Sequence, residues 1–465
     1  ARERSTFVKF HWRPKIGAAS VLWDEAVKIN GADPDFHRRD LFDAIARGQF
    51  PEFEFAIQAF DQKTADGFDF DVLDPTKLIP EETVPLEPIG RMVLNRNPVN
   101  FFAETEQVAF HPGHIDPCID FSNDPMLQGR LISYTDTQLS RLGGPNFHEI
   151  PVNRPRCPMR NFQRDAIMRM DVPEGRVAYD PNSLAPDSPR ENPSLGFTSF
   201  PAEDEDGGVK ARVRSETFSD HYSQARMFWR SMSDPEQRHI VGAFSFELGK
   251  VETVAIRRRM LGHLAIVEPD LYHRVADALG MAGQAERIQP ARQPIDLKPS
   301  PALSIVQKAP RTLEGRTIGV LVSDGTDRVL VDALRAAVDK AGARLAVVAP
   351  KIGGVAAADG KHIDADHALA AAPSIFFDAV VLCPSLAGVQ QLTHESAALD
   401  WVREAFGHLK VIGFSDVASP IFEAAGLNPD AGMVVVDGPK GVAAFIAAAK
   451  GPRIWAREPT LRSRV

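Results

Sequence analysis

The pattern of apolar positions divides the chain into three kinds of sequence. Between residues 1 and 110, stretches rich in aromatic and β-branched residues (STFVKFHW, FEFAIQAF and FDFDVL) alternate with proline-rich turns, which predicts antiparallel strands. From about residue 219 to 280, apolar residues recur at helical spacing. After residue 313, compact apolar runs alternate with amphipathic, alanine-rich stretches, which predicts a parallel sheet covered by helices on both faces.

The last of these regions has the pattern of a doubly wound α/β domain. Its apolar runs, each ending in turn residues, are TIGVLVSDG, ARLAVVAP, FDAVVLCPS, LKVIGFSD and AGMVVVDG. Stretches such as VLVDALRAAVDKAG and AALDWVREAFG separate them and have helical spacing. We therefore predict a flavodoxin-like domain over residues 313–465, in which any ligand would bind beyond the carboxyl ends of the strands.

Two shifts in composition mark boundaries. Residues 180–210 are crowded with Pro, Asp, Asn and Gly, so we expect no regular element there. Residues 286–312 hold repeated prolines, which is typical of a stiff, extended connector between two globular parts. These prolines are Pro290, Pro294, Pro299, Pro301 and Pro310.

The helical region has a clear start signal. Residues 233–236 (SDPE) have the form of a capping box with Pro235 in the first turn. Ile240, Phe244 and Leu248 then recur at four-residue spacing. We interpret this stripe as ordinary core packing.

The sequence NDPMLQGRLISYTDTQLSRLGGP, residues 123–145, predicts one helix of about five turns. Asn123 or Asp124 can cap it, and Pro125 suits the first helical position. Gly143, followed by a second glycine and a proline, gives a firm stop.

One face of this predicted helix carries an unusual set of side chains. Arg130 precedes Tyr134 by one turn, so its guanidinium can reach the phenolic oxygen and favour the phenolate, a hard anionic ligand suited to ferric haem iron. Arg141 is placed to meet a haem propionate, and Gly129 leaves room for a flat macrocycle. The alternative, a solvated cation-aromatic contact, stays open. The face comprises Met126, Arg130, Ser133, Tyr134, Thr137, Gln138 and Arg141.

Composition narrows the possible partners. The chain has 53 basic and 62 acidic residues and a net charge of -9, so nothing attracts it generally to nucleic acid or anionic lipid. No apolar run approaches the roughly 20 residues that cross a bilayer, and ARERSTFVKF lacks the apolar centre of a secretory signal. We expect a soluble, cytoplasmic protein. Cys118, Cys157 and Cys383 lie far apart, so disulfides and structural zinc are not expected.

The predicted α/β domain offers weak signals for other chemistry. Gly413–Val417 matches four of the five elements of a G-x-S-x-G elbow, but no histidine follows residue 408 to complete a hydrolase triad. Cys383 ends a strand and is interpreted as a buried small apolar residue. The acidic turn at residues 324–327 would repel phosphate. We predict no hydrolase or amidotransferase activity, and a non-enzymatic role in folding, assembly or stability stays open.

Residues 90–155 resemble the haem catalase family nearly throughout, and RLISYTDT resembles that family's proximal tyrosine signature. The similarity extends through DPDFHRRDLFDAI, LDPTKLIPEE, FQRDAIMRMD and EQRHIVGAFSFELGKV. A flavodoxin-like tail after a proline-rich linker marks the large-subunit branch of the family.

The resemblance implies an α+β multidomain fold. Its parts would be the later portion of an antiparallel β-barrel (1–109), a wrapping arm with the proximal haem helix (110–215), an α-helical domain (216–285), a linker (286–312) and a flavodoxin-like, amidotransferase-like domain (313–465). Homotetramers are usual in the family.

The implied function is the dismutation of hydrogen peroxide to dioxygen and water through a ferryl haem intermediate, with haem of the b or d type. Tyr134 would be the proximal iron ligand, Arg130 its charge partner and Arg141 a propionate contact. His111 would lie near Tyr134, and in some large-subunit catalases the corresponding pair is covalently linked. Residues matching haem-pocket positions are Phe110, Met126, Ser133, Thr137 and Gln138.

The sequence departs from the family in one respect. The family's distal histidine and asparagine would precede residue 1, and none of the 13 histidines lies in a matching motif. We therefore expect this chain to be inactive by itself, as a processed product, a fragment, or one piece of a complex in which a separate chain supplies the distal half.

Overall fold

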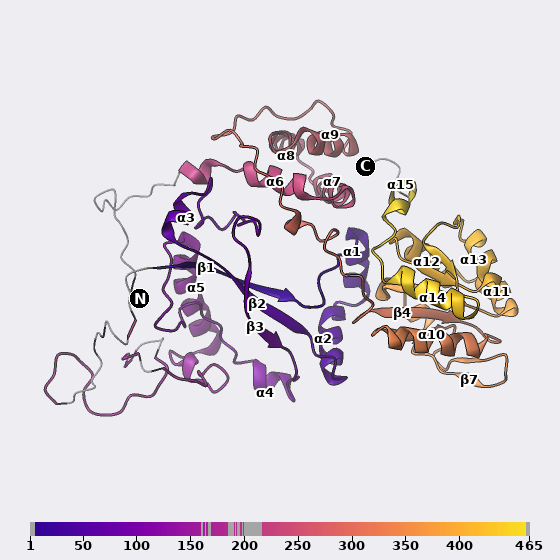
Figure 1. Ribbon diagram of the computed structural model, residues 1–465, viewed down its shortest axis with the longest axis horizontal. Coiled ribbons are helices and arrows are strands. Elements are labelled where there is room, and N and C mark those ends of the chain that lie inside the picture. Colours follow the sequence, from indigo (N-terminus) through magenta and orange to yellow (C-terminus); the bar gives the residue numbers. More distant parts are fainter. Residues whose placement is uncertain are drawn as a thin grey trace.

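The computed structural model describes residues 5–159, 161, 162, 164, 165, 169–184, 190, 192, 196, 197, 199 and 216–461. Figure 1 shows a small sheet beside α5 (Pro125–Leu142) and a group of helices from α6 (Ser223–Ser231) to α9 (Pro269–Ala278) above this sheet. The C-terminal α/β part lies at the opposite end.

The N-terminal part contains a three-stranded antiparallel sheet in the order β1-β2-β3. β1 (Phe7–Pro14) and β2 (Glu52–Phe60) confirm two of the predicted strands. Helices α1 (Trp23–Ala32) and α2 (Phe36–Ala46), which the sequence pattern did not predict, connect these strands. The short helix α3 (Gln62–Asp66) follows β2.

The predicted strand at FDFDVL, residues 68–73, is wrong. Phe68 packs beside Phe60, with ring centroids 5.7 Å apart, and the Asp71 carboxylate accepts a hydrogen bond from the Leu73 N–H at 2.9 Å. An aspartate that bonds to nearby backbone favours a turn over a strand. The third strand is instead β3 (Glu87–Val93), whose proline and glycine obscure the strand pattern.

The helix predicted from residue 125 is confirmed as α5 (Pro125–Leu142). The Asp124 carboxylate accepts from the Met126 N–H at 2.8 Å, and Gly143 ends the helix with a φ of 73°. Because glycine adopts this left-handed conformation without a Cβ clash, the helix stops there. The neighbouring short elements are α4 (Phe101–Thr105) and the 3-10 turn η1 (Phe147–Glu149).

The helical region is confirmed over residues 216–278. The Glu236 carboxylate accepts from the Ser233 N–H at 2.9 Å, as the capping box predicts. Leu248 is buried, and Ile240 and Phe244 pack against the same cluster, so the predicted stripe is core. The elements are η2 (Glu216–Ser219), α6 (Ser223–Ser231), α7 (Asp234–Gly249), α8 (Val254–Val267) and α9 (Pro269–Ala278).

The two proline-rich stretches have different outcomes. Most of residues 180–210, and the end of the proposed wrapping arm, lie outside the described residues. The stretch 286–312 is irregular apart from η3 (Pro301–Leu303). It is also bonded to the body, because Glu82 accepts from the Ser300 hydroxyl at 2.6 Å and Glu236 accepts from the Val306 N–H at 3.0 Å. The domain bounds themselves stay a prediction.

The C-terminal part contains the predicted parallel sheet, in the order β11-β10-β9-β4-β5-β8. With β4 as the first strand, the five longer strands follow the 2-1-3-4-5 order of flavodoxin-like sheets. Val320 belongs to the core cluster on one face and Leu321 to the cluster on the other, so both faces are covered. The strands are β4 (Thr317–Val322), β5 (Arg344–Ala349), β8 (His367–Ala368), β9 (Ala379–Cys383), β10 (Ile412–Phe414) and β11 (Met433–Val435).

Helices and short elements surround this sheet. The helices are α10 (Arg328–Lys340), α11 (Leu386–Leu392), α12 (Ser396–Gly407), α13 (Ser419–Ala424), α14 (Gly438–Ala449) and α15 (Glu458–Leu461). The two-stranded β6 (Val355–Ala356) and β7 (His362–Ile363) pair separately. The 3-10 turns are η4 (Leu369–Ala371), η5 (Ser374–Phe376), η6 (Asp416–Ala418) and η7 (Trp455–Arg457).

The C-terminal part docks on α1 through buried charges. Glu25 is 1% exposed, and its two carboxylate oxygens lie 2.9 Å from Lys410 Nζ and 2.9 Å from Arg453 Nη2. Asp24 lies 3.0 Å from His408 Nε2. The contact also includes an aromatic stack between Phe36 and Phe376, whose ring centroids are 5.7 Å apart.

Within the described residues, no helix is both long enough and apolar enough to cross a bilayer.

Candidate functional site

The predicted site residues of α5 lie along one largely open side of the helix. Arg130, Ser133, Thr137 and Arg141 are exposed, as is Met126 at 56%. Tyr134 is half-buried and Gln138 is buried. The helix therefore presents a phenol between two guanidinium groups.

Arg130 and Tyr134 form the contact that their spacing predicts. Arg130 Nη2 donates a long hydrogen bond of 3.4 Å to Tyr134 Oη, and the guanidinium carbon lies 5.2 Å from the ring centroid. The guanidinium therefore places a positive charge beside the phenolic oxygen. This geometry suits an anionic oxygen ligand.

Gly129 leaves the adjacent surface open. A Cβ built there would have no neighbour within 4 Å apart from the helix's own backbone. Phe110, 78% exposed, adds an apolar side chain beside the same helix. An open, partly apolar helix face with a phenol and two cations is the donor set that a haem with a tyrosinate ligand and anionic propionates requires.

His111 is brought to α5 from the preceding segment. Its Nδ1 accepts from the Gly113 N–H at 2.8 Å, so Nε2 carries the proton and donates to Thr135 Oγ1 at 2.7 Å. The Thr135 hydroxyl in turn donates to the Leu131 carbonyl at 3.0 Å. A Cβ at position 113 would lie 2.8 Å from the His111 ring, so only glycine allows this placement. The ring centroids of His111 and Tyr134 are 6.5 Å apart.

Two further histidines, which sequence reasoning missed, lie next to His111: His114 stacks on it, and His148 meets His114 edge-on. The rings of His111 and His114 are 4.8 Å apart, and those of His114 and His148 are 6.1 Å apart. Burial, with His111 and His148 nearby, lowers the pKa of His114 to about 4. Burial also lowers the pKa of His148, with Arg169 as a second cause. These imidazoles are therefore neutral at pH 7. The motif AFHPGH contained His114, but its spacing alone gave no reason to select it.

Arg141 and Gln138 bond to the segment before His111. Arg141 Nη1 donates to the Val108 carbonyl at 2.8 Å, and Nη2 contacts the Glu106 carbonyl. Gln138 Nε2 donates to the Phe110 carbonyl at 3.0 Å, while its Oε1 is buried without a partner among the described residues. Arg141, which was expected to contact a propionate, thus already holds the backbone of residues 106–110, which form one wall of the candidate site. A guanidinium has five N–H donors, so Arg141 can bond these carbonyls and a propionate at the same time.

The described residues form no cluster of three or more His, Cys, Asp or Glu side chains that could hold a bare metal ion. A haem brings four ring nitrogens of its own and needs only one strong axial ligand from this side. Tyr134 fits that requirement.

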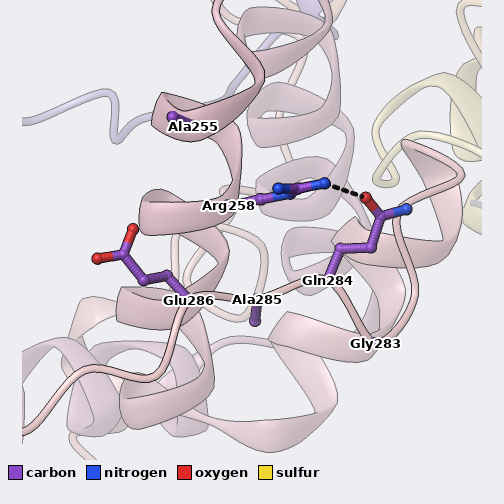
Figure 2. Close-up of a pocket in the computed structure, with 6 residues that line it drawn as sticks. All are labelled: Ala255, Arg258, Gly283, Gln284, Ala285 and Glu286. Carbon is purple, nitrogen blue, oxygen red and sulfur yellow. Dashed lines mark hydrogen bonds between the residues drawn. The ribbon is translucent and has the colours of Figure 1, made fainter.

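A separate hollow of about 420 Å³ lies between α8 and the loop after α9. Figure 2 shows the Arg258 guanidinium pointing toward the Gln284 side chain, to which it donates at 3.4 Å, while Glu286 points away. The other lining residues are Ala255, Gly283 and Ala285. None of the predicted haem contacts lines this hollow.

The residues singled out in the C-terminal part are structural. Cys383 is 2% exposed and packs in the core, and burial raises the pKa of its thiol, so it stays protonated. Ser415 has an ordinary extended backbone, with φ -72° and ψ 144°, instead of a strained nucleophile elbow. In the acidic turn, Asp324 accepts from the Ala356 N–H, and Asp327 caps α10.

Three family models match along the chain. Residues 1–186 match the family described as catalase, residues 215–279 match "Catalase-related immune-responsive", and residues 314–459 match the C-terminal domain found in long catalases.

Individual relatives cover nearly the whole chain. "Catalase C" of Rhizobium meliloti (strain 1021) is 52% identical over 99% of this chain and 66% of its own length. "Catalase HPII" of Pseudomonas putida is 47% identical over 98% of this chain and 64% of its own. "Catalase-2" of Bacillus subtilis (strain 168) is 42% identical over 98% and 66%. The chain thus spans about two thirds of the length of these relatives. It belongs to the catalase family, in the branch that carries the C-terminal domain of long catalases.

Proposed function

We propose that this chain supplies the proximal side of a haem site in an enzyme that dismutates hydrogen peroxide. The observation that carries the proposal is the Arg130–Tyr134 contact on the open face of α5, in a chain similar to catalases over nearly its whole length. The net reaction converts two hydrogen peroxide molecules to two water molecules and one dioxygen. When bound, the haem supplies the redox chemistry by which one peroxide is reduced and the other oxidised.

The residues of α5 would have distinct roles toward the haem. Tyr134 would donate its phenolate oxygen to the iron, and Arg130 would be its charge partner through the contact with that oxygen. Arg141 would bond a propionate while it supports the carbonyls of residues 106 and 108. The remaining contacts would come from Phe110, Met126, Ser133, Thr137 and Gln138.

The haem is of the b or d type, and we propose a His111–Tyr134 cross-link with the d type. A bond from a His111 ring nitrogen to the Tyr134 β-carbon removes one hydrogen from each residue, and a hydrogen peroxide molecule that accepts both becomes two waters. The His111 and Tyr134 ring centroids lie 6.5 Å apart, which supports this proposal. Separate tryptic peptides carrying His111 and Tyr134, from protein that has turned over peroxide, would exclude it.

The complete enzyme also needs an acid–base group on the opposite side of the haem to move the peroxide proton. No histidine of this sequence lies in a motif matching that role. We therefore propose that residues 1–465 by themselves are inactive. We also propose that the working assembly is a homotetramer.

The test of the proximal assignment is Tyr134→Phe, which removes the phenolate and should abolish most haem retention, as measured by haem absorbance of the purified protein. Arg130→Ala should retain haem but shift its charge-transfer bands, because the guanidinium no longer contacts the phenolic oxygen. The matched control is Tyr179→Phe, a change at an exposed tyrosine. Full haem occupancy with an unchanged spectrum in Tyr134→Phe would refute the assignment.

A further inference from the structure

Residues 106–110 belong to no helix or strand, yet their backbone is firmly held. Asn153 Oδ1 accepts from the Ala109 N–H at 2.7 Å. Asn153 Nδ2 donates to the Gln107 carbonyl at 2.8 Å and to the Phe147 carbonyl at 2.8 Å. Both donors and the acceptor of this one amide are therefore in use.

These bonds join two parts of the site wall. Phe147 belongs to η1 and is 1% exposed, so it is a fixed anchor. Ala109 is 7% exposed and immediately precedes Phe110 and His111. Asn153 thus holds the backbone that carries both side chains to its place relative to the buried anchor.

The opposite side of the segment is held by α5. Gln138 bonds the Phe110 carbonyl and Arg141 bonds the Val108 carbonyl. Arg141, however, would divide its N–H groups between this segment and the proposed propionate. The Asn153 side chain is uncharged and does not attract a propionate. Its three bonds therefore hold residues 106–110 whether or not a cofactor is bound.

We propose that Asn153 is a positioning residue for the haem site, which sets Phe110 and His111 beside Tyr134. This inference rests on the proposed function. Asn153 acts through the backbone of residues 107–109 and touches none of the reacting atoms.

The first readout is independent of haem. In Asn153→Ala, amide hydrogen exchange of residues 107–111, followed by mass spectrometry, should accelerate by about tenfold, because the loss of hydrogen bonds lets the segment open. The matched control is Asn146→Ala, an exposed asparagine next to η1 whose side chain makes no capping bond. Exchange in the control should match the unsubstituted protein. If both variants behave alike, the proposal is overturned.

The second readout separates positioning from mere stability. In the haem-loaded protein, Asn153→Ala should shift the charge-transfer absorbance although Tyr134 and Arg130 are intact, and the control should not. Faster exchange with an unchanged spectrum would overturn the positioning role. If Asn153→Ala does not fold, Asn153→Asp replaces it, because the aspartate keeps the acceptor for the Ala109 N–H and removes both donors. Asn153→Asp should also accelerate amide exchange and shift the charge-transfer absorbance. Exchange that matches the Asn146→Ala control, or an unchanged spectrum, would overturn the proposal.

Failure of the proposed function is distinguishable from failure of the inference about Asn153. In that case the unsubstituted protein would lack haem absorbance that depends on Tyr134. The tenfold exchange effect of Asn153 would still be measurable.

Discussion

The two sheets of this protein differ in how completely they are covered. The six-stranded C-terminal sheet lies between two large clusters of buried residues, and Phe445 on one face and Trp401 on the other are almost fully buried. The three-stranded N-terminal sheet has only a small buried cluster, and Phe10 and Trp12 on β1 are 53% and 51% exposed. The predicted haem contacts do not lie in the well-covered C-terminal part. They lie in the N-terminal part, on the exposed face of α5. Open surface is where a large planar cofactor and further polypeptide can bind.

The largest effect is expected when residues 1–465 are tested for catalysis by themselves. Residues 1–465 expressed alone and reconstituted with haem should evolve oxygen from peroxide about a hundredfold to ten-thousandfold more slowly than an intact catalase, because a positioned acid–base group contributes on that order. The free chain should also tend to aggregate through its exposed strand edges. Oxygen evolution near the rate of an intact catalase would show that a residue of this chain performs the distal role.

The junction between the two parts gives the next test. Glu25→Gln leaves Lys410 buried with a weakened partner, and loss of one member of a buried ion pair typically costs about 3–5 kcal/mol. Denaturant unfolding should detect this loss. Glu25→Leu combined with Lys410→Met should recover only part of the stability: the buried lysine charge is gone, but Arg453 still loses its carboxylate partner. The control Glu52→Gln, in the exposed pair with Lys15, should cost about 1 kcal/mol or less.

The same junction should be sensitive to acid. Burial would raise the pKa of Glu25, but Lys410 and Arg453 outweigh it, and the pKa is lowered overall. Its contribution to stability is therefore fully present above the unfolded carboxyl pKa of about 4.3 and is lost as pH falls through the lower folded value. In Glu25→Gln, stability should depend less steeply on pH below about 4.3. An unchanged acid dependence would contradict this assignment.

Two phenylalanine substitutions compare how well the C-terminal and N-terminal sheets are packed. Phe445→Ala in the closed core should lower the free energy of unfolding by about 3–5 kcal/mol. Phe10→Ala on the open sheet should cost much less, because the side chain is half exposed and loses mainly its stack on Phe55. Thermal or denaturant unfolding of each variant measures the difference. Equal losses would mean that the N-terminal sheet is as well packed as the C-terminal one.

The smallest effect is expected at Ser415. Its hydroxyl is buried without a hydrogen-bond partner among the described residues, and no catalytic base accompanies it in the sequence. Ser415→Ala should therefore leave peroxide turnover and esterase turnover unchanged, with a stability change of about 1 kcal/mol or less. A loss of esterase turnover would reveal a hydrolytic site in the C-terminal part.

The sequence determined the features that depend on neighbouring residues. Asp124, Pro125 and Gly143 set the ends of α5, because capping and left-handed turns are local interactions. The Arg130–Tyr134 contact followed from one turn of helix. The C-terminal strands followed from continuous apolar runs, because strands buried on both faces need apolar side chains at every position.

Only the tertiary structure decided which distant residues meet. Asp24 and His408 bond across 384 positions, and Asn153 reaches back to hold Ala109, yet no periodicity links either pair. The failed strand at residues 68–73 has the same cause, since Phe68 is drawn into a cluster with Phe60 while the aspartates between the apolar residues favour a turn. Periodicity reports which face of an element is apolar, whereas the partner of that face depends on how the whole chain closes around it.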